Sequence, residues 1–170
     1  MKKIILIVLM VIIAIVGISG CTEETPKNKT YSADGITFQY PGNWTELNKT
    51  KYTLLDLGNT SKGIFVLGNQ KNRLTFGKVT PGKGQALNTL PKWAQLTKIR
   101  LSSKGGQFLS EKNLTIAGAN AHQLRFMSPD GGYYTGIVFI KNNTGYIMVY
   151  ASIYNETETL DNILKSFKMP

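Results

Sequence analysis

The sequence is poor in the side chains from which metal and thiol sites are built. Its 170 residues include one cysteine, Cys21, and one histidine, His122. A single cysteine cannot form a disulfide within the chain, and one Cys with one His supplies too few ligands for a structural zinc site. No glycine-rich phosphate-binding motif occurs either. We therefore expect no metal ion, no cofactor and no catalytic residue, and we expect a structural role for His122 in a strand.

Acidic residues are also scarce, since ten Asp and Glu stand against 20 Lys and Arg and give a net charge of +10. No acid lies between Asp56 and Glu111, whereas nine cations do: Lys62, Lys71, Arg73, Lys78, Lys83, Lys92, Lys98, Arg100 and Lys104. Such a block favours an anionic surface or an acidic protein as partner, unless it is only a solvated surface. Three of these cations fall in one predicted strand and its flanking turn, and we expect them to contact the anionic partner: Lys71, Arg73 and Lys78.

Only the start of the chain carries a long apolar run. Two lysines precede the 13 apolar residues 4–16, and small residues follow up to Cys21. This is the three-part pattern of an export signal, and the run is shorter than the roughly 20 residues of a membrane span. The segment Ile18-Ser19-Gly20-Cys21 resembles a lipoprotein lipobox. We expect residues 1–20 to be a signal peptide and a lipid on Cys21 to hold the protein on the outer face of the cell membrane. The alternatives are a plain secretory signal and an uncleaved anchor.

Seven Asn-x-Ser/Thr sequons support export, because such sequons accept glycans only on exported proteins. Export also makes nucleic acid an improbable partner. Six sequons are candidate glycosylation sites: Asn28, Asn48, Asn59, Asn113, Asn142 and Asn155. We expect Asn43, which is next to Trp44, to be too buried for modification. The other explanation is that Asn and Thr serve here only as turn and strand residues.

The part of the chain that follows the signal divides into a polar tether, residues 21–30, and one domain, residues 31–170. Short apolar runs bounded by turn residues predict strands at 36–40, 52–57, 64–67 and 74–79. Residues 107–110 and 114–116 are expected to flank a bend, and residues 122–127, 133–141 and 146–154 to form three consecutive antiparallel strands.

Two segments have helical periodicity. The first spans about residues 90–101, with Pro91 in its first turn and Thr89 as its cap. The second is near the C-terminus, with apolar residues at Leu160, Ile163, Leu164 and Phe167, and with Asn155 and Glu158 as a capping pair. Strands 133–141 and 146–154 are apolar on both faces, so we expect helices on both faces of the sheet. The predicted class is α+β, an α/β/α sandwich around a mainly antiparallel sheet.

Two motifs resemble a known family. Residues 31–44, YSADGITFQYPGNW, are similar to the opening of PsbP-like domains, in which a strand enters a "YP-x-x-W" turn. Residues 145–151, GYIMVYA, followed by a short helix and the residues 166–168, resemble the end of these domains, especially in exported lipoproteins of archaea and bacteria. The resemblance spans residues 31–170 and implies the same sandwich. The family includes extrinsic subunits of photosystem II and Mog-type proteins that bind a GTPase, so it implies no single activity, and no functional residue is carried over.

The sequence thus favours a membrane-tethered exported lipoprotein with a non-catalytic binding or accessory domain. The alternative is an exported hydrolase or transferase whose site uses only acids. It would need two carboxylates that converge in a pocket, for example from Asp34, Asp56 or Asp130. A surface protein without a specific ligand is a third possibility.

Overall fold

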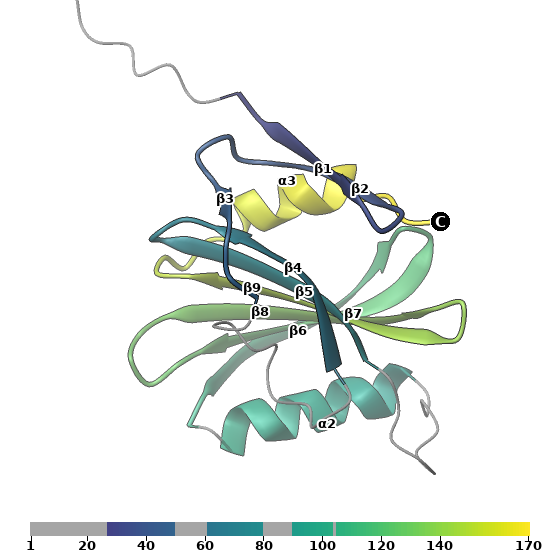
Figure 1. Cartoon of the computed structure of the whole chain (residues 1–170). Helices are drawn as coiled ribbons and strands as arrows, with labels where there is room; N and C mark the ends of the chain where they lie inside the picture. The colour runs from purple at the N-terminus through teal and green to yellow at the C-terminus, as the bar shows by residue number, and fades with distance from the viewer. Residues whose placement is uncertain (1–26, 50–60, 80–89, 104) are drawn as a thin grey trace, which may run out of the picture.

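The strands form two antiparallel sheets (Figure 1). The structure is a computed structural model that describes residues 27–49, 61–79, 90–103 and 105–170. Within these residues the larger sheet has seven strands, in the spatial order β3-β4-β5-β9-β8-β7-β6. They are β3 (Thr45–Glu46), β4 (Ser61–Gly68), β5 (Asn72–Val79), β9 (Thr144–Ser152), β8 (Tyr133–Lys141), β7 (Ala119–Met127) and β6 (Gln107–Ile116). The smaller sheet is a hairpin of β1 (Lys29–Ala33) and β2 (Ile36–Tyr40).

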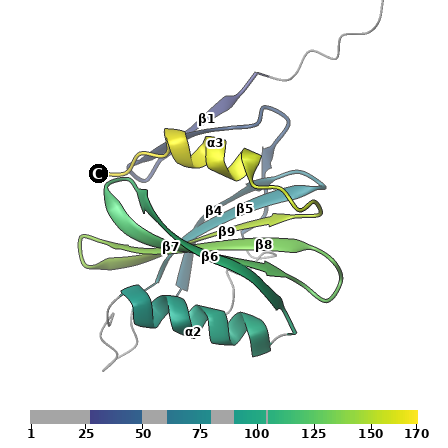
Figure 2. The ribbon, with the colours of Figure 1, turned by 180° about the vertical axis from the view of Figure 1, so that it is seen from behind.

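The larger sheet has a helix on each face, as Figure 1 and Figure 2 show. Helix α3 (Glu158–Ser166) lies on one face together with the β1–β2 hairpin, and helix α2 (Leu90–Ser103) covers the other. A β-bridge between Thr37 and Lys168 joins the hairpin to the segment that follows α3. The expected α+β fold, with helices on both faces of a mainly antiparallel sheet, is confirmed.

Each face of the sheet contributes to its own hydrophobic core, because alternate residues of a strand point to opposite sides. In β8, Ile137 and Phe139 belong to the core beneath α3, and Val138 belongs to the core beneath α2. All three are fully buried. Leu160 closes the first core from α3, and Trp93 closes the second from α2. This arrangement explains why the strand sequence is apolar at successive positions.

The turns between β7, β8 and β9 decide where these strands end. Ser128 and Gly132 close the β7–β8 loop, with the Ser128 N–H donating to the Gly132 carbonyl at 2.8 Å. The β8–β9 turn is tighter than expected. Asn142 and Asn143 have φ of 49° and 57°, which asparagine tolerates in two-residue turns of this kind. Strand β9 therefore runs from residue 144 to 152, and the prediction of a strand over 146–154 is wrong at both ends.

Strand β6 is continuous, so the predicted bend between residues 110 and 114 is wrong. Glu111, Lys112 and Asn113 are exposed, because β6 lies at one edge of the larger sheet. An edge strand can be polar at successive positions, and this polarity resembled a turn in the sequence. The only irregularity of the β6–β7 pairing is a register shift between Phe108 and Ser110.

Both helices lie where their apolar periodicity predicts them. The prediction of a helix over residues 90–101 is confirmed by α2. Its expected cap, Thr89, lies outside the described residues. The strand expected at 52–57 also lies outside them. The capping pair of α3 is wrong. Thr157 is the N-cap residue and makes no side-chain capping bond, while Asn155 accepts a hydrogen bond from Arg125. Strand β1 begins at Lys29, two residues inside the segment expected to be a tether.

Candidate functional site

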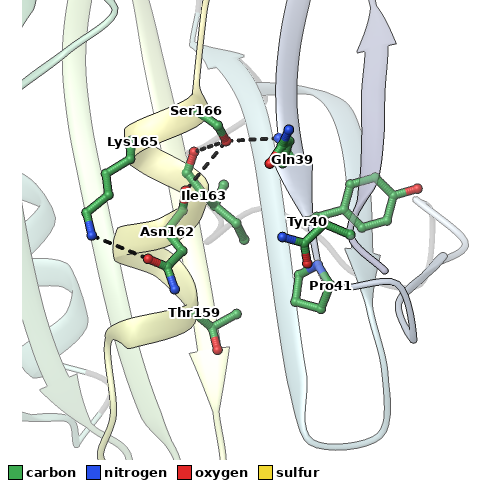
Figure 3. Close-up of a pocket in the computed structure, with 9 residues that line it drawn as sticks. Gln39, Tyr40, Pro41, Thr159, Asn162, Ile163, Lys165 and Ser166 are labelled. Atoms are coloured by element: carbon green, nitrogen blue, oxygen red, sulfur yellow. Dashed lines mark hydrogen bonds between the residues drawn. The ribbon is translucent and has the colours of Figure 1, made fainter. Parts of the chain in front are cut away.

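A groove of about 390 Å³ lies between helix α3 and the β1–β2 hairpin (Figure 3). It is lined mainly by polar side chains: Asn28, Gln39, Tyr40, Pro41, Thr159, Asn162, Ile163, Lys165 and Ser166. The strand supplies one wall and the exposed side of the helix supplies the other. Tyr40 and Pro41 belong to the opening motif that the sequence showed, but nothing in the sequence placed them beside α3.

Hydrogen bonds fix the two walls of the groove to each other. The backbone N–H of Gln39 donates to Ser166 Oγ at 2.9 Å, and Ser166 Oγ in turn donates to the Ile163 carbonyl at 2.9 Å. Lys165 Nζ donates to Asn162 Oδ1 at 3.4 Å. The lining therefore offers amides, hydroxyls and one ammonium group. These groups can bind a polar or anionic molecule, but the nine lining residues include no histidine, cysteine or carboxylate for acid–base or nucleophilic chemistry.

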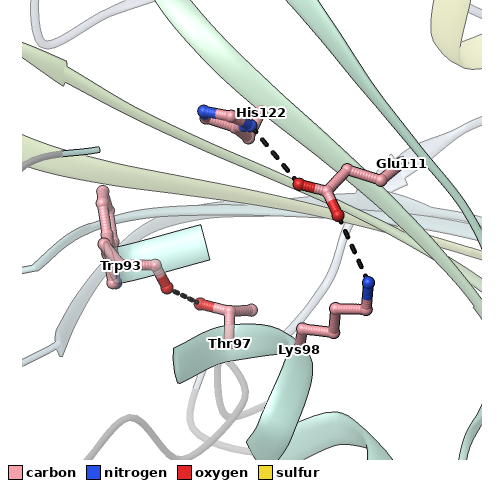
Figure 4. Close-up of polar contacts among 5 residues, drawn as sticks. All are labelled: Trp93, Thr97, Lys98, Glu111 and His122. Atoms are coloured by element: carbon pink, nitrogen blue, oxygen red, sulfur yellow. Dashed lines mark hydrogen bonds and ion pairs between the residues drawn. The ribbon is translucent and has the colours of Figure 1, made fainter. Parts of the chain in front are cut away.

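His122 lies in a second polar cluster, on the other face of the sheet (Figure 4). Its Nδ1 is 3.6 Å from Glu111 Oε1, and Glu111 Oε2 is 3.4 Å from Lys98 Nζ. Lys98 also lies over the ring of Phe108, with Nζ 3.7 Å from the centroid. These contacts connect α2 to β6 and β7. No nucleophilic side chain takes part in these contacts.

Two of the three acids named in the alternative enzyme hypothesis lie far apart. Asp34 is exposed in the β1–β2 turn, near the C-terminus, and Asp130 is exposed in the β7–β8 loop at the opposite end of the molecule (Figure 1). The Ser128 hydroxyl, and then the backbone of Gly132, lower the pKa of Asp130 by hydrogen bonding to it. Asp56 lies outside the described residues. Asp34 and Asp130 therefore do not form a carboxylate pair.

The three cations expected to contact an anionic partner are not brought together. Lys71 is exposed in the turn before β5, and its Nζ is 5.8 Å from the centroid of the Tyr154 ring. Arg73 and Lys78 are five positions apart in β5, which pairs with β9 without a register shift. An odd separation puts their side chains on opposite faces. The expectation of one shared patch is therefore wrong.

The sequons for which the structure gives burial are all exposed at their asparagine. This holds for Asn28, Asn48, Asn113, Asn142 and Asn155. Asn43 is also exposed, although its neighbour Trp44 is 1% exposed, so the reason given for excluding Asn43 is wrong. Asn59 lies outside the described residues. The positions of these asparagines are compatible with modification.

Within the described residues, no group of three or more His, Cys, Asp or Glu side chains is placed to hold a metal ion. In the same part of the chain, no helix is long and apolar enough to cross a membrane.

Comparison with solved structures defines the class of the fold. No protein-family model matches the chain, and no curated protein matches it. The solution structure of cyanobacterial PsbP from Synechocystis sp. PCC 6803 matches with a TM-score of 0.58 and 13% identity, covering 91% of this chain and 99% of that one. A crystal structure from Bacteroides thetaiotaomicron has a TM-score of 0.49 and 12% identity over 86% of this chain and 49% of its own. A Pseudomonas aeruginosa protein of unknown function and putative regulator, PA94, has a TM-score of 0.41 and 9% identity over 74% of this chain and 82% of its own.

The chain therefore has a PsbP-like α+β fold, as the two sequence motifs implied. Its likeness to the cyanobacterial protein extends over nearly the whole of both chains. At 13% identity that likeness concerns the fold alone, and function has to be argued from the residues of this chain.

Proposed function

We propose that this protein is an exported lipoprotein, held on the outer face of the cell membrane by a lipid on Cys21, whose PsbP-like domain binds a partner or ligand without catalysing a reaction. The observation that carries the proposal is the position of Cys21. It ends a signal-like segment and stands eight residues before β1, which begins at Lys29. The fold thus starts almost directly after the proposed anchor.

The groove supports a binding role. It lies where the chain enters the fold, since Asn28 is one of its lining residues. Its amide, hydroxyl and ammonium groups suit hydrogen bonding to a ligand, and its lining has no acid–base pair. A binding or accessory module fits these groups better than a hydrolase or transferase does, because Asp34 and Asp130 lie apart.

The anchor is tested by Cys21→Ser, with Ser19→Ala as the matched control that keeps a small residue before the cysteine. Cells are fed a labelled fatty acid, and the membrane and soluble fractions are compared. We expect label on the wild type and on Ser19→Ala, and an unlabelled Cys21→Ser chain in the soluble fraction. Retention of Cys21→Ser on the membrane, with residues 1–20 removed, contradicts the proposal.

The binding role is tested by photocrosslinking in intact membranes. A photoreactive residue replaces Gln39 in the groove or, as the control, Gln95, which is exposed on α2. We expect a discrete adduct from position 39 that position 95 does not give. Equal or absent adducts at the two positions contradict a binding role for the groove.

A further inference from the structure

Two consecutive large apolar side chains are exposed just after β9. Ile153 is 55% exposed and Tyr154 is 49% exposed, and Lys71 lies beside them with its Nζ 5.8 Å from the Tyr154 ring centroid. We call these three residues the apolar tip. Single exposed apolar residues are common on protein surfaces, but an adjacent pair with a neighbouring lysine forms a combined surface.

The apolar tip is held firmly by its own backbone. The Ile153 N–H donates to the Lys71 carbonyl at 3.1 Å, and the Tyr154 N–H donates to Ser152 Oγ at 3.0 Å. The Tyr154 carbonyl accepts from the Glu156 N–H at 2.9 Å. Ile153 and Tyr154 are therefore kept at the surface by a defined turn.

The apolar tip lies at the same end of the molecule as the start of β1. Figure 1 and Figure 2 both show the N-terminal end of β1, the β4–β5 turn and the segment after β9 at one end of the sheets. Side-chain contacts agree with this placement. Lys29 Nζ donates to the Trp44 carbonyl at 3.1 Å, and the Trp44 ring stacks on Tyr150, three residues before Ile153. The point where the chain enters the fold is thus close to the apolar tip.

This position matters because the proposed tether is short. Seven peptide units separate Cys21 from Asn28, and fully extended they span at most about 25 Å. The outer surface of α2 also carries exposed apolar side chains, Leu96 at 58% and Ile99 at 57%. However, α2 is on the opposite face of the sheet from β1 (Figure 1), and two layer spacings of about 10 Å use up nearly all of that length. The tether therefore brings the apolar tip to the membrane with length to spare, whereas the outside of α2 would need it almost fully extended.

We propose that the apolar tip rests on the lipid surface that holds the anchor, with Ile153 and Tyr154 in the headgroup region and Lys71 beside anionic headgroups. The proposal rests on the proposed lipidation of Cys21. A tyrosine ring suits the boundary between water and acyl chains, isoleucine gains from leaving water, and a lysine stem can lie along apolar surface while its ammonium meets phosphate. The contact adds to the hold of the lipid on Cys21, because membrane affinity rises with the apolar area that is buried and with the attraction to anionic lipids.

The test uses the full lipidated chain in vesicles of phosphatidylcholine and phosphatidylglycerol. An environment-sensitive fluorophore is placed on Ile153→Cys or, as the matched control, on Leu96→Cys, which is equally exposed on α2. Lipids with brominated acyl chains quench a label that reaches the bilayer. The wild type is a second control, because its single cysteine takes up no label once it carries a lipid.

We expect the label at 153 to lose more than about half of its emission and the label at 96 to lose little, since interfacial residues lie about 5–10 Å into the headgroup–acyl boundary. Equal quenching, or stronger quenching at 96, overturns the proposal and leaves the anchor in place. A wild-type chain that does not float with the vesicles overturns the lipid anchor itself. Shielding at 153 in native membranes but not in pure lipid identifies a protein partner and also overturns the proposal.

The role of Lys71 is tested in the Ile153→Cys chain by Lys71→Glu, with Lys78→Glu as the control. Both lysines are exposed, but Lys78 is near the opposite end of β5. At low salt we expect Lys71→Glu to reduce quenching on anionic vesicles and Lys78→Glu to leave it unchanged. Equal effects of the two variants contradict a local contact through Lys71.

Discussion

The indole ring of Trp44 stacks on the phenol ring of Tyr150, with centroids 6.4 Å apart and planes 17° from parallel. Trp44 ends the turn after β2, and Tyr150 belongs to β9 in the centre of the larger sheet. Each of the two residues is 1% exposed. The pair therefore connects the β1–β2 layer to the sheet, and it gives the tryptophan of the opening motif a structural role.

Trp44→Ala should lower the free energy of unfolding by about 3–5 kcal/mol, because it removes a fully buried aromatic ring and leaves a cavity. Urea unfolding of residues 22–170, which include every described strand and helix, measures the loss. Tyr154→Ala is the control, since that ring is 49% exposed and its loss should change stability by about 0.5 kcal/mol or less. Similar losses for the two variants would show that the turn after β2 is peripheral.

The two leucines of α3 should differ in their contribution. Leu160 is 0% exposed, whereas Leu164 is only partly buried, at the margin of the same core. Leu160→Ala should cost about 2–5 kcal/mol, and Leu164→Ala clearly less, because less apolar surface leaves water at that position. Denaturant unfolding of both variants checks the order. A larger loss for Leu164→Ala would mean that α3 is rotated on the sheet.

The helices could be predicted because their apolar spacing follows from the faces they bury. Leu160 and Ile163 show this for α3. The exposed edge strand β6 could not be predicted as a whole, since Glu111 and Lys112 carry no alternation imposed by burial on both sides. The apolar spacing of a segment thus predicts that a helix or strand is present, whereas where it ends depends on the elements packed beside it.

The groove could not be predicted from spacing at all. Gln39 and Ser166, which join its walls, are 127 positions apart in the chain. Arg73 and Lys78 show the opposite case, because they are close in the sequence but lie on opposite faces of β5. Neighbouring strand residues share a face only when an even number of positions separates them. The exposure of Ile153 and Tyr154 could not be predicted, because the sequence pattern put both residues in a strand over 146–154.

Glycosylation should differ between two exposed sequons. Asn142 is in the β8–β9 turn with a positive φ, whereas Asn155 accepts a hydrogen bond from Arg125 at 2.8 Å and adjoins the apolar tip. A glycan at Asn155 would hold the apolar tip away from lipid, so we expect Asn142 and not Asn155 to be modified. Mass spectrometry of peptides from the native host gives the occupancy, and Asn142→Gln should remove a mobility shift. High occupancy at Asn155 would contradict both this prediction and the lipid contact.

Tyr150 should make stability depend on alkaline pH. Burial, and then its hydrogen bond to the Glu156 carboxylate, raise the pKa of the Tyr150 hydroxyl well above its usual range. The unfolded tyrosine loses its proton near pH 10, while the folded protein keeps it there. The unfolded state therefore binds fewer protons above that pH, and the free energy of unfolding falls as the pH rises from about 10.

Tyr150→Phe removes this titration together with the hydrogen bond. Near pH 8 the variant should be less stable than the wild type by about 1.5–3 kcal/mol, the contribution of a hydrogen bond to a charged group. Above pH 10 the difference should shrink, because only the wild type loses stability through this hydroxyl. Urea unfolding at pH 8, 9, 10 and 11 follows both proteins. Glu156→Gln is the matched control, since its amide oxygen still accepts a hydrogen bond without the negative charge, and its dependence on pH should be intermediate. Parallel curves for the wild type and Tyr150→Phe would show that the Tyr150 hydroxyl does not contribute to stability in this way.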